Sequence, residues 1–397
     1  MIELEKAFEM VKENCFEMQI EDVNVEKITG FVCMEDLFSK IDMPPFDKSA
    51  MDGYAFKHSS RHGQYQKTGI LQAGSSSSIE VGDGECVSIM TGAPLPAGTD
   101  TVIMIEATGE EGTKINFKKI PPKGSNVCYK GEDIKKGDLI FQKGRKIKSS
   151  DIALITASGY SKVKVSKKPE ISVLNTGTEI IEPGNDLKFG QIYNTNGIML
   201  RAMCENYGLE TKYLGIAEDD EKKLSEKISE GMKSDILLIS GGVSMGEFDL
   251  VPKILEKLGV EKIFHKIRIK PGKPVFFGKK GNCLIFGLPG NPLSNFVGFE
   301  LFVKTALRKM TGESLTLPIF LKGFIQRSFS HKGNRKNFYP AEIKYENGTV
   351  KIYPVVSNGS ADIFSLSKSN GFLIGDINTR NYEPGDEIEY ICFEGTV

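Results

Sequence analysis

The sequence predicts a multidomain protein in which a doubly wound α/β domain is combined with β domains. Residues 169–314 alternate between apolar strand-like runs and amphipathic helical segments, the pattern of a parallel sheet covered on both faces. Residues 46–130 consist of short apolar runs separated by Gly and Pro. Residues 315–397 contain a hairpin signal, Asn347-Gly348, between alternating strands. The chain of 397 residues also exceeds the size that one hydrophobic core usually supports.

Four domains follow from these patterns. The N-terminal helical segment ends at a Pro-Pro break, after which a small β domain is inserted into a mixed linking domain. The α/β domain comes next, and a C-terminal β domain of barrel-like character ends the chain. The first helix is also a candidate to pack on the α/β domain. The expected boundaries are residues 1–43 and 134–168 for the linking domain, 44–133 for the small β domain, 169–314 for the α/β domain and 315–397 for the C-terminal domain.

Composition and charge limit the possible partners. Hydrophobic residues at 40% and charged residues at 26% are typical of a globular protein. The net charge of -1 gives no bulk attraction to nucleic acid or anionic lipid, so neither is expected as a partner. The seven cysteines are widely spaced and form no Cys-x-x-Cys pair, which favours a reduced, cytoplasmic chain. No segment approaches the ~20 apolar residues of a membrane span.

Three Gly-containing turns follow strands of the predicted parallel sheet, at the edge where open α/β sheets bind ligands. Glycine lets backbone N–H groups approach an anion, and Ser and Asn side chains add donors. One such turn can equally be a tight connection to a helix, but three on one edge favour a ligand site. Neither a dinucleotide-binding nor a P-loop fingerprint is present. The turns are NTGTE (175–179), ISGGVSMGEFD (239–249) and FGLPGNPLS (286–294).

Carboxylates lie in or beside these turns, and a basic segment, HKIRIKPGKP (265–274), precedes the last of them. Carboxylates near anion-binding turns can hold a divalent cation that neutralises phosphate oxygens, although helix capping is an alternative for Asp219. Lys270 and Lys273 suit a polyanion, or else belong to a solvated strand edge. The four scattered histidines argue against a catalytic triad or a His-rich zinc site. These residues alone indicate an α/β enzyme that uses Mg²⁺ on a phosphorylated, nucleotide-like small molecule.

The sequence resembles the molybdopterin molybdenumtransferases, the MoeA-type proteins related to the E domain of gephyrin-like proteins. Eight motifs occur in the order and approximate spacing of that family, and they extend over nearly the whole chain. The C-terminal domain matches only in size and β character. The motifs are PPFDKSAMDGYAF, SIMTGAPLPAGTDTVIMIE, GEDIKKGD, NTGTEI, GQIYNTN, DILLISGGVSMGEFD, IKPGKP and GLPGNPLS.

The resemblance implies both the reaction and the assembly. Adenylylated molybdopterin is bound, its pyrophosphate bond is cleaved and molybdate is inserted, so that AMP and molybdenum cofactor are released with the help of Mg²⁺. The family forms a homodimer with a composite active site, between the α/β molybdopterin-binding domain of one subunit and the small β domain of the other. Molybdopterin adenylyltransferase and other cofactor-biosynthesis proteins are the implied partners.

The resemblance also assigns roles to residues of this chain. The catalytic residues are Asp52, Thr91, Asp133, Glu179, Asp219 and Asp249. Three of these are also the implied metal ligands, namely Glu179, Asp219 and Asp249. The substrate-binding residues are Thr176, Gly177, Ser240, Gly241, Gly242, Ser244, Lys270, Lys273, Pro289, Gly290, Asn291, Pro292 and Ser294.

Two aspartates in the first motif have different expected roles. Asp52 is expected to face the phosphate-binding edge of the partner subunit, whereas Asp47 is expected to cap a turn. Four apolar residues are expected to anchor this loop, namely Phe46, Met51, Tyr54 and Phe56.

The chain departs from the family before the GEDI motif. The family commonly carries one or more arginines there, whereas this chain has Cys128, Tyr129 and Lys130. Lysine keeps a positive charge but lacks the bidentate geometry of a guanidinium group. Molybdate affinity, or the preference for molybdate over tungstate, could therefore differ in this protein.

Two other functions remain open from the sequence. The adenylyltransferase that makes the substrate shares the α/β domain, but it is typically that domain alone, and the flanking domains here favour the insertase. A non-catalytic molybdopterin-binding scaffold is the other alternative. The intact acidic and Gly-rich motifs argue against a loss of catalysis.

Overall fold

The computed structural model describes residues 1–75, 79–243, 249–331, 333–378 and 380–393. The predicted site residue Ser244 lies outside this range, as does the neighbouring carboxylate Glu247. The chain divides into two compact units. The larger comprises Met1–Glu21, Gly30–Met34 and Val165–Val397, and the smaller comprises Asp22–Thr29 and Glu35–Lys164.

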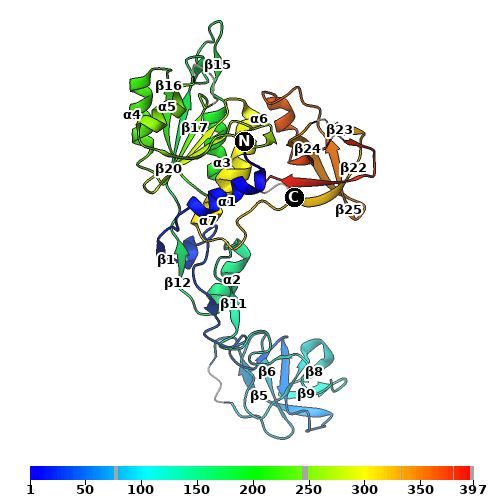
Figure 1. Cartoon of the computed structure of the whole chain (residues 1–397). Coiled ribbons are helices and arrows are strands. Elements are labelled where there is room, and N and C mark those ends of the chain that lie inside the picture. Colours follow the sequence, from blue (N-terminus) through cyan, green and yellow to red (C-terminus); the bar gives the residue numbers. More distant parts are fainter. Residues whose placement is uncertain (76–78, 244–248, 332, 379, 394–397) are drawn as a thin grey trace. The chain divides into compact units, whose positions relative to one another are not determined.

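A six-stranded sheet lies at the centre of the α/β part of the larger unit (Figure 1). The strand order is β16-β13-β17-β21-β20-β18, and the first four strands are parallel, as predicted. The pairings of β20 with β21 and β18 are antiparallel, which the sequence pattern did not predict. Only Gly281 and Asn282 separate β20 from β21, and so short a connection permits only antiparallel pairing. The strands are β13 (Ile171–Thr176), β16 (Thr211–Ala217), β17 (Ile236–Ser240), β18 (Glu261–Phe264), β20 (Phe276–Lys280) and β21 (Cys283–Leu288).

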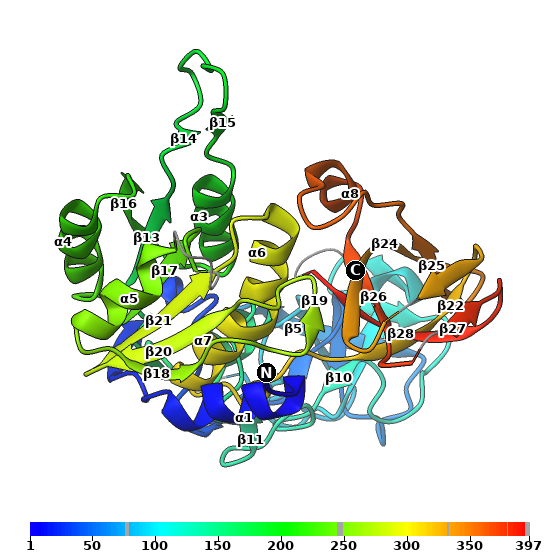
Figure 2. The same ribbon diagram turned by 45° about the horizontal axis from the view of Figure 1, so that its top comes forward.

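Helices cover both faces of this sheet, which confirms the doubly wound prediction (Figure 2). Successive side chains of a strand point to opposite faces. On β17, Ile236 and Leu238 pack in the cluster that includes α1, α3, α6 and α7. Leu237 and Ile239 pack instead with α4 and α5. The helices are α1 (Leu4–Asn14), α3 (Asn196–Asn206), α4 (Glu221–Gly231), α5 (Leu250–Lys257), α6 (Pro292–Gly298), the π-helical turn Phe299–Val303 and α7 (Lys304–Met310).

A short arm projects from the edge of the α/β part between β13 and α3 (Figures 1 and 2). It contains β14 (Ile180–Ile181) and β15 (Ile192–Tyr193), which pair in parallel. The Tyr213 hydroxyl donates a hydrogen bond to Glu182 at the base of this arm, and Asn194 donates to the same carboxylate at 3.1 Å. Burial, followed by the bond to Glu182, raises the pKa of Tyr213, so this phenol stays protonated as a donor.

The C-terminal region is a closed five-stranded barrel, because β24 pairs with both β25 and β26. Asn347 and Gly348 have φ angles of 51° and 78°, which confirms the predicted type I′ hairpin turn. A strand of the basic segment, β19, pairs in parallel with β24 and extends the barrel sheet. The elements are β19 (Ile269–Lys270), β22 (Leu321–Ile325), β23 (Phe329–His331), β24 (Lys336–Glu346), β25 (Thr349–Pro354), α8 (Ile363–Ser367), β26 (Gly371–Gly375), β27 (Arg380–Tyr382) and β28 (Glu387–Cys392).

The smaller unit contains a curled six-stranded sheet in the order β7-β4-β6-β5-β9-β8. The central strand β4 is buried along its whole length, with Ala55 in one apolar cluster and Tyr54 and Phe56 in another. The sheet strands are β4 (Gly53–Phe56), β5 (Gln64–Leu71), β6 (Glu85–Ile89), β7 (Thr101–Met104), β8 (Thr108–Glu111) and β9 (Lys114–Phe117).

The remaining elements of the chain are β1 (Ile20–Asn24), the 3₁₀ turns Val25–Lys27 and Ile105–Ala107, β2 (Leu37–Phe38), β3 (Lys48–Ser49), β10 (Val127–Cys128), β11 (Leu139–Phe141), α2 (Ser149–Ala157) and β12 (Lys162–Ser166).

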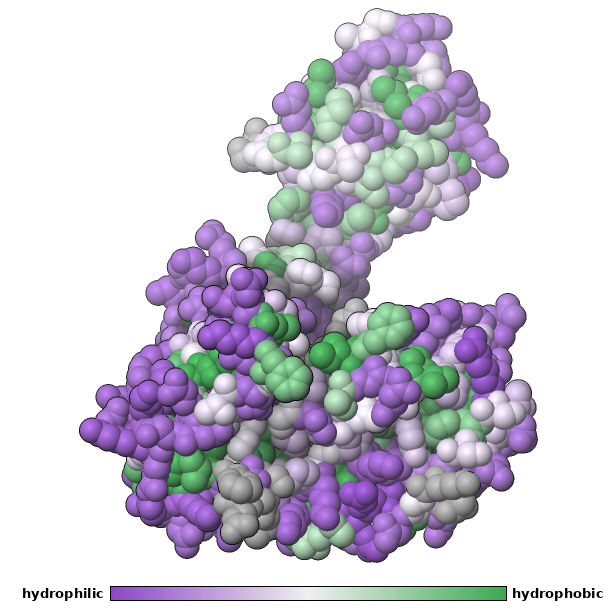
Figure 3. All heavy atoms as spheres, turned by 90° about the horizontal axis from the view of Figure 1, so that it is seen from above, coloured by the Kyte–Doolittle hydropathy of each residue, from purple (hydrophilic) through white to green (hydrophobic). Residues whose placement is uncertain are grey.

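The surface of the larger unit is mainly hydrophilic on the face shown in Figure 3, with apolar residues in small separate groups. Among the helices that the structure describes, none combines the length and the apolar character needed to cross a membrane.

Gly53 begins β4 at a point of close backbone contact. A Cβ atom there would lie 1.9 Å from the carbonyl oxygen of Ile103. We expect Gly53→Ala to lower the free energy of unfolding by about 3 kcal/mol, since that carbonyl belongs to the paired strand β7 and cannot withdraw. Gly63→Ala is the control, because nothing lies within 4 Å of its Cβ position, and its change should stay within about 0.5 kcal/mol. Chemical denaturation of both variants measures the difference; equal stabilities would contradict this packing.

Candidate active site

The Gly241-Gly242 turn is packed directly against the end of β13. A Cβ atom at Gly241 would lie 2.5 Å from the Thr176 carbonyl oxygen, and one at Gly242 would lie 2.8 Å from Thr176 Oγ1. Both glycines have positive φ angles, of 93° and 61°. The pair is therefore required by the close approach of two neighbouring strand ends. This requirement holds whether or not the turn also binds a ligand.

The predicted carboxylates are distributed over three neighbouring strand ends. Asp220, not Asp219, caps α4, since its side chain accepts from the backbone N–H of Lys223 at 2.8 Å. Asp219 instead accepts from the backbone N–H of Thr178 at 3.4 Å, in the turn that follows β13. The Glu179 carboxylate folds back over the same turn, with one oxygen 2.6 Å from the Cβ position of Gly177. The capping alternative for Asp219 is thus wrong, and Asp219 and Glu179 adjoin one turn.

Asp249 lies at the third strand end, where it begins α5 after β17. It occupies the N-cap position but makes no side-chain capping bond to the helix. β17 pairs with β13, whose other neighbour is β16, so the strands that precede the three carboxylates in the chain are neighbours in the sheet. Over the described residues, no three His, Cys, Asp or Glu side chains are grouped closely enough to hold a metal ion.

Two buried asparagines hold the turns after β17 and β21 together. Asn196 Nδ2 donates to Ser240 Oγ at 3.0 Å and to the Gly290 carbonyl at 2.7 Å. Asn295 Nδ2 donates to the same Ser240 oxygen at 2.9 Å and to the Pro289 carbonyl at 3.2 Å. The predicted substrate-binding residues Ser240, Pro289 and Gly290 are therefore brought together by two side chains that were not predicted to belong to the site.

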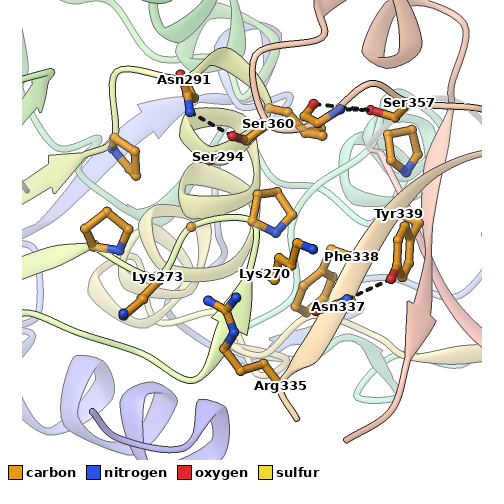
Figure 4. A pocket seen from close by; sticks show the side chains of 17 residues that line it. Lys270, Lys273, Asn291, Ser294, Arg335, Asn337, Phe338, Tyr339, Ser357 and Ser360 are labelled. Carbon is orange, nitrogen blue, oxygen red and sulfur yellow. Dashed lines mark hydrogen bonds between the residues drawn. The ribbon is translucent and has the colours of Figure 1, made fainter. Parts of the chain in front are cut away.

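A cationic pocket of about 370 Å³ lies between the α/β part and the barrel, both in the larger unit (Figure 4). Lys270 and Lys273 line it, together with Pro289, Asn291 and Ser294 of the predicted set. Arg335, which precedes β24, adds a third positive charge. Within the described part of the chain, no carboxylate lies within 4.0 Å of these three cations, whose charge is therefore available to an anion.

Contacts between the two parts fix the walls of this pocket. Arg335 donates to the Ile269 carbonyl at 3.3 Å, next to Lys270 on β19. Asn291 Nδ2 donates to Ser360 Oγ at 2.7 Å, a bond that Figure 4 shows. Sequence reasoning missed Arg335 and Ser360, because each lies in a polar segment whose pattern resembles any surface loop. Only the pairing of β19 with β24 places Arg335 beside the two lysines.

The smaller unit brings together two other predicted residues, Asp52 and Thr91. Asp52 Oδ1 accepts from the backbone N–H of Thr91 at 2.7 Å and from its hydroxyl at 2.8 Å. These bonds, the backbone bond first, hold the pKa of Asp52 below its ordinary value. Asp52 is exposed and ionised, so it presents a fixed negative charge.

Asp47 caps a turn, as expected, but this turn belongs to a segment distant along the chain. Its Oδ1 accepts from the backbone N–H of Lys130 at 2.8 Å and so ties the first motif to the segment before GEDI. Only two of the four apolar residues expected to anchor this loop are buried. Tyr54 and Phe56 are buried, whereas Phe46 and Met51 are exposed.

The segment that departs from the family is held by local contacts. Lys130 Nζ lies 3.4 Å from Asp42 Oδ2, so its charge already has a partner. Burial, and next a hydrogen bond with Glu132, raises the pKa of the Cys128 thiol, which therefore stays neutral. Asp133 is exposed, and its backbone N–H donates to the Met43 carbonyl at 3.0 Å.

The fold and the charged pocket define a multidomain α/β protein with a candidate site for an anionic ligand. Three family regions match the chain: the MoeA N-terminal region (domain I and II) at residues 2–159, the probable molybdopterin binding domain at 172–309, and the MoeA C-terminal region (domain IV) at 322–393. The chain belongs to the molybdopterin molybdenumtransferase (MoeA) family.

Individual relatives resemble the chain over almost its full length. A molybdopterin molybdenumtransferase of Staphylococcus aureus (strain Mu50 / ATCC 700699) is 32% identical, over 99% of this chain and 96% of the relative. One from Staphylococcus epidermidis (strain ATCC 12228 / FDA PCI 1200) is 28% identical over the same shares. The crystal structure of a molybdopterin biosynthesis MoeA protein from Pyrococcus horikosii has a TM-score of 0.82 and 33% identity, and covers 99% of both chains.

Replacing Thr91 by Val removes the hydroxyl bond to Asp52 but leaves the backbone bond. We expect the pKa of Asp52 to rise in Thr91→Val yet remain below its ordinary value, because the backbone bond is the larger cause. A lowered carboxyl pKa stabilises the folded state at pH values above the ordinary pKa of an aspartate. This stabilisation is lost as the pH falls through the pKa of Asp52 in the folded state. NMR titration of the Asp52 carboxyl measures the change, with Thr91→Ser as the control that keeps the hydroxyl. An unchanged titration in Thr91→Val would contradict the assignment.

Proposed function

We propose that this protein inserts molybdate into adenylylated molybdopterin, with cleavage of the pyrophosphate bond and release of AMP and molybdenum cofactor. The observation that carries the proposal is the cationic pocket of Lys270, Lys273 and Arg335 beside a sheet edge that carries carboxylates. The cations suit a small oxyanion, and the carboxylates suit a divalent cation that neutralises the phosphate oxygens of the substrate. The sequence similarity to molybdopterin molybdenumtransferases supports the same activity.

In this proposal the basic and the acidic residues of the site have different roles. Lys270, Lys273 and Arg335 hold the molybdate oxyanion in the pocket, and the turns after β13, β17 and β21 receive the pterin and its phosphates. A carboxylate on the sheet edge orients the water that attacks the pyrophosphate and takes its proton. The lysines then stabilise the charge that develops on the departing phosphate.

Mg²⁺ fits the carboxylate pair at the β13 turn. Mg²⁺ is usually held by one or two carboxylates together with substrate phosphates, so a preformed cage of three ligands is not required. Glu179 and Asp219 adjoin one turn, and Asp219 is not used to cap a helix. Bound there, Mg²⁺ would neutralise the phosphate oxygens of the substrate. Asp249 from the neighbouring strand end is the third candidate ligand.

A homodimer completes the site in this proposal. Asp52 and Thr91 form an exposed, ionised pair in the smaller unit, whereas the other catalytic candidates except Asp133 belong to the larger unit. A second copy supplies the Asp52–Thr91 pair to the sheet edge of the first. Molybdopterin adenylyltransferase is the partner that delivers the substrate.

The reaction itself tests the function. Purified protein incubated with adenylylated molybdopterin, Mg²⁺ and molybdate should release AMP and form cofactor that activates a molybdenum-dependent apoenzyme. Arg335→Gln should raise the molybdate concentration for half-maximal rate about tenfold, because one charged contact to the oxyanion is lost. Arg327→Gln, at an exposed arginine beside Tyr353 on the barrel, is the matched control and should behave as wild type.

The outcomes separate the candidate functions. Consumption of ATP and molybdopterin, without molybdate dependence, would indicate the adenylyltransferase instead. Binding of molybdopterin without any AMP release would indicate the scaffold. If the rate of Arg335→Gln depended on molybdate concentration as the wild-type rate does, the proposed role of the pocket in molybdate binding would be contradicted.

Mixing two inactive variants tests the composite site. We expect Asp52→Asn and Asp249→Asn each to fold normally and to lose activity, since each removes a charge from the surface of the site. After subunit exchange, half of the dimers carry one of each subunit, and each of these has one intact site. The mixture should therefore recover about a quarter of wild-type activity, measured as AMP release. No recovery, with exchange shown by mass spectrometry, would contradict a site shared between subunits.

A further inference from the structure

Asp362 closes a short loop on the barrel side of the cationic pocket. Its Oδ2 atom accepts a hydrogen bond from the backbone N–H of Asn358 at 2.9 Å. Its own backbone N–H donates to the Gly359 carbonyl at 3.1 Å. Gly359 has a φ angle of 124°, a conformation that residues other than glycine rarely adopt. The chain therefore turns back on itself within residues 358–362, and Ser360 lies at the middle of this turn.

Ser360 brings a hydroxyl group to the wall of the pocket, whose positive charge comes from two lysines and an arginine (Figure 4). Its Oγ atom accepts from Asn291 Nδ2 at 2.7 Å, and its carbonyl accepts from the backbone N–H of Leu293 at 3.1 Å. These two bonds hold Ser360 from the side of α6. The loop that Asp362 closes holds Ser360 from the side of the barrel.

The Asp362 carboxylate uses its two oxygens for two different bonds. Oδ1 accepts from the backbone N–H of Ser365 at 3.0 Å and so caps α8. A cap needs one oxygen only, which Asn or Ser would supply equally well. Oδ2 is the atom that reaches Asn358 in the loop. The two backbone bonds, that from Asn358 first, hold the pKa of Asp362 below its ordinary value, so both oxygens accept at neutral pH.

We propose that Asp362 is a positioning residue for the cationic pocket: it closes the loop so that the Ser360 hydroxyl can donate to the oxyanion that the cations attract. The described lining of the pocket does not include Asp362, so it acts through Ser360 rather than by contact with the ligand. The inference rests on the proposed function, because that function supplies molybdate as the oxyanion.

The sign of the effect distinguishes positioning from simple electrostatics. Asp362 carries a negative charge close to a site for an anion, and removal of that charge should by itself strengthen anion binding. Loss of the loop bond should instead weaken binding, because the hydroxyl donor is displaced. Weaker binding in a neutral variant is therefore a result that only the geometry of the loop explains.

Molybdate binding by the full-length protein, measured by isothermal titration calorimetry, tests the proposal. Asp362→Asn has one acceptor oxygen and cannot serve both N–H groups, and Asp362→Ser keeps the cap but cannot reach the loop. We expect each variant to bind molybdate about tenfold more weakly. In the AMP-release assay, the molybdate concentration for half-maximal rate should rise by the same factor while kcat stays at the wild-type value.

A double-mutant cycle shows whether Asp362 acts through Ser360. We expect Ser360→Ala to lose about tenfold in molybdate affinity, and Ser360→Ala with Asp362→Asn to lose about twentyfold rather than a hundredfold, because both changes remove the same donor. The matched control is Asp386→Asn on the barrel. Asp386 Oδ2 accepts from the backbone N–H of Glu383 at 2.9 Å in a turn outside the described lining of the pocket, so this variant should bind molybdate as wild type does.

The outcomes separate this inference from the proposed function. A molybdate affinity of Asp362→Asn equal to or above that of wild type would overturn the positioning role, as would losses that multiply in the double variant or a fall in kcat alone. Wild-type protein that binds molybdate but releases no AMP would overturn the proposed function and leave the positioning role standing. Wild-type protein that binds no molybdate would overturn the positioning role, and its AMP release would then decide the function separately.

Discussion

Burial of three parallel strands on both faces is the constraint on which the α/β part depends. β13, β17 and β21 are buried at every residue and have helices on each side, so polar side chains near these strands are concentrated at the carboxyl edge. Side chains at the same edge must form hydrogen bonds with the backbone N–H and C=O groups of the turns that leave the sheet. Asn196 does this for Gly290 and Asn295 does it for Pro289, and through their bonds to Ser240 they also connect the turns after β17 and β21.

The pairing of β19 with β24 is the second determinant of the site. Two residues of the basic segment join the barrel sheet, so the barrel and the α/β part share backbone hydrogen bonds. The Arg335–Ile269 and Asn291–Ser360 contacts then connect the walls of the pocket. Arg335 is held by the Ile269 carbonyl, and among the described residues none of the three cations forms an ion pair with an acidic side chain. Their charge is therefore not neutralised within the pocket.

Much of the fold could be predicted from local patterns. Strand–helix alternation located the parallel strands, and Asn347-Gly348 located the C-terminal hairpin, because these signals depend on residues close in sequence. The antiparallel strands β18 and β20 were missed, since an apolar run has the same appearance in either direction. Asp219 and Asp220 could not be assigned separately, because adjacent carboxylates offer the same capping chemistry until the backbone selects one of them.

The sequence alone determined the family, the turns at the sheet edge and the chemical types of the candidate residues, because each is encoded in contiguous motifs. Only the tertiary structure decided which side chains meet. Arg335 reaches Lys270 through a strand pairing, and Asn295 reaches Ser240 across a separation of 55 residues. Such contacts arise from packing between segments distant along the chain. Neither the hydrophobic periodicity nor the composition of the sequence predicts them. The Ser240 hydroxyl is of this kind, since it accepts hydrogen bonds from two amides that are brought together only in the folded chain.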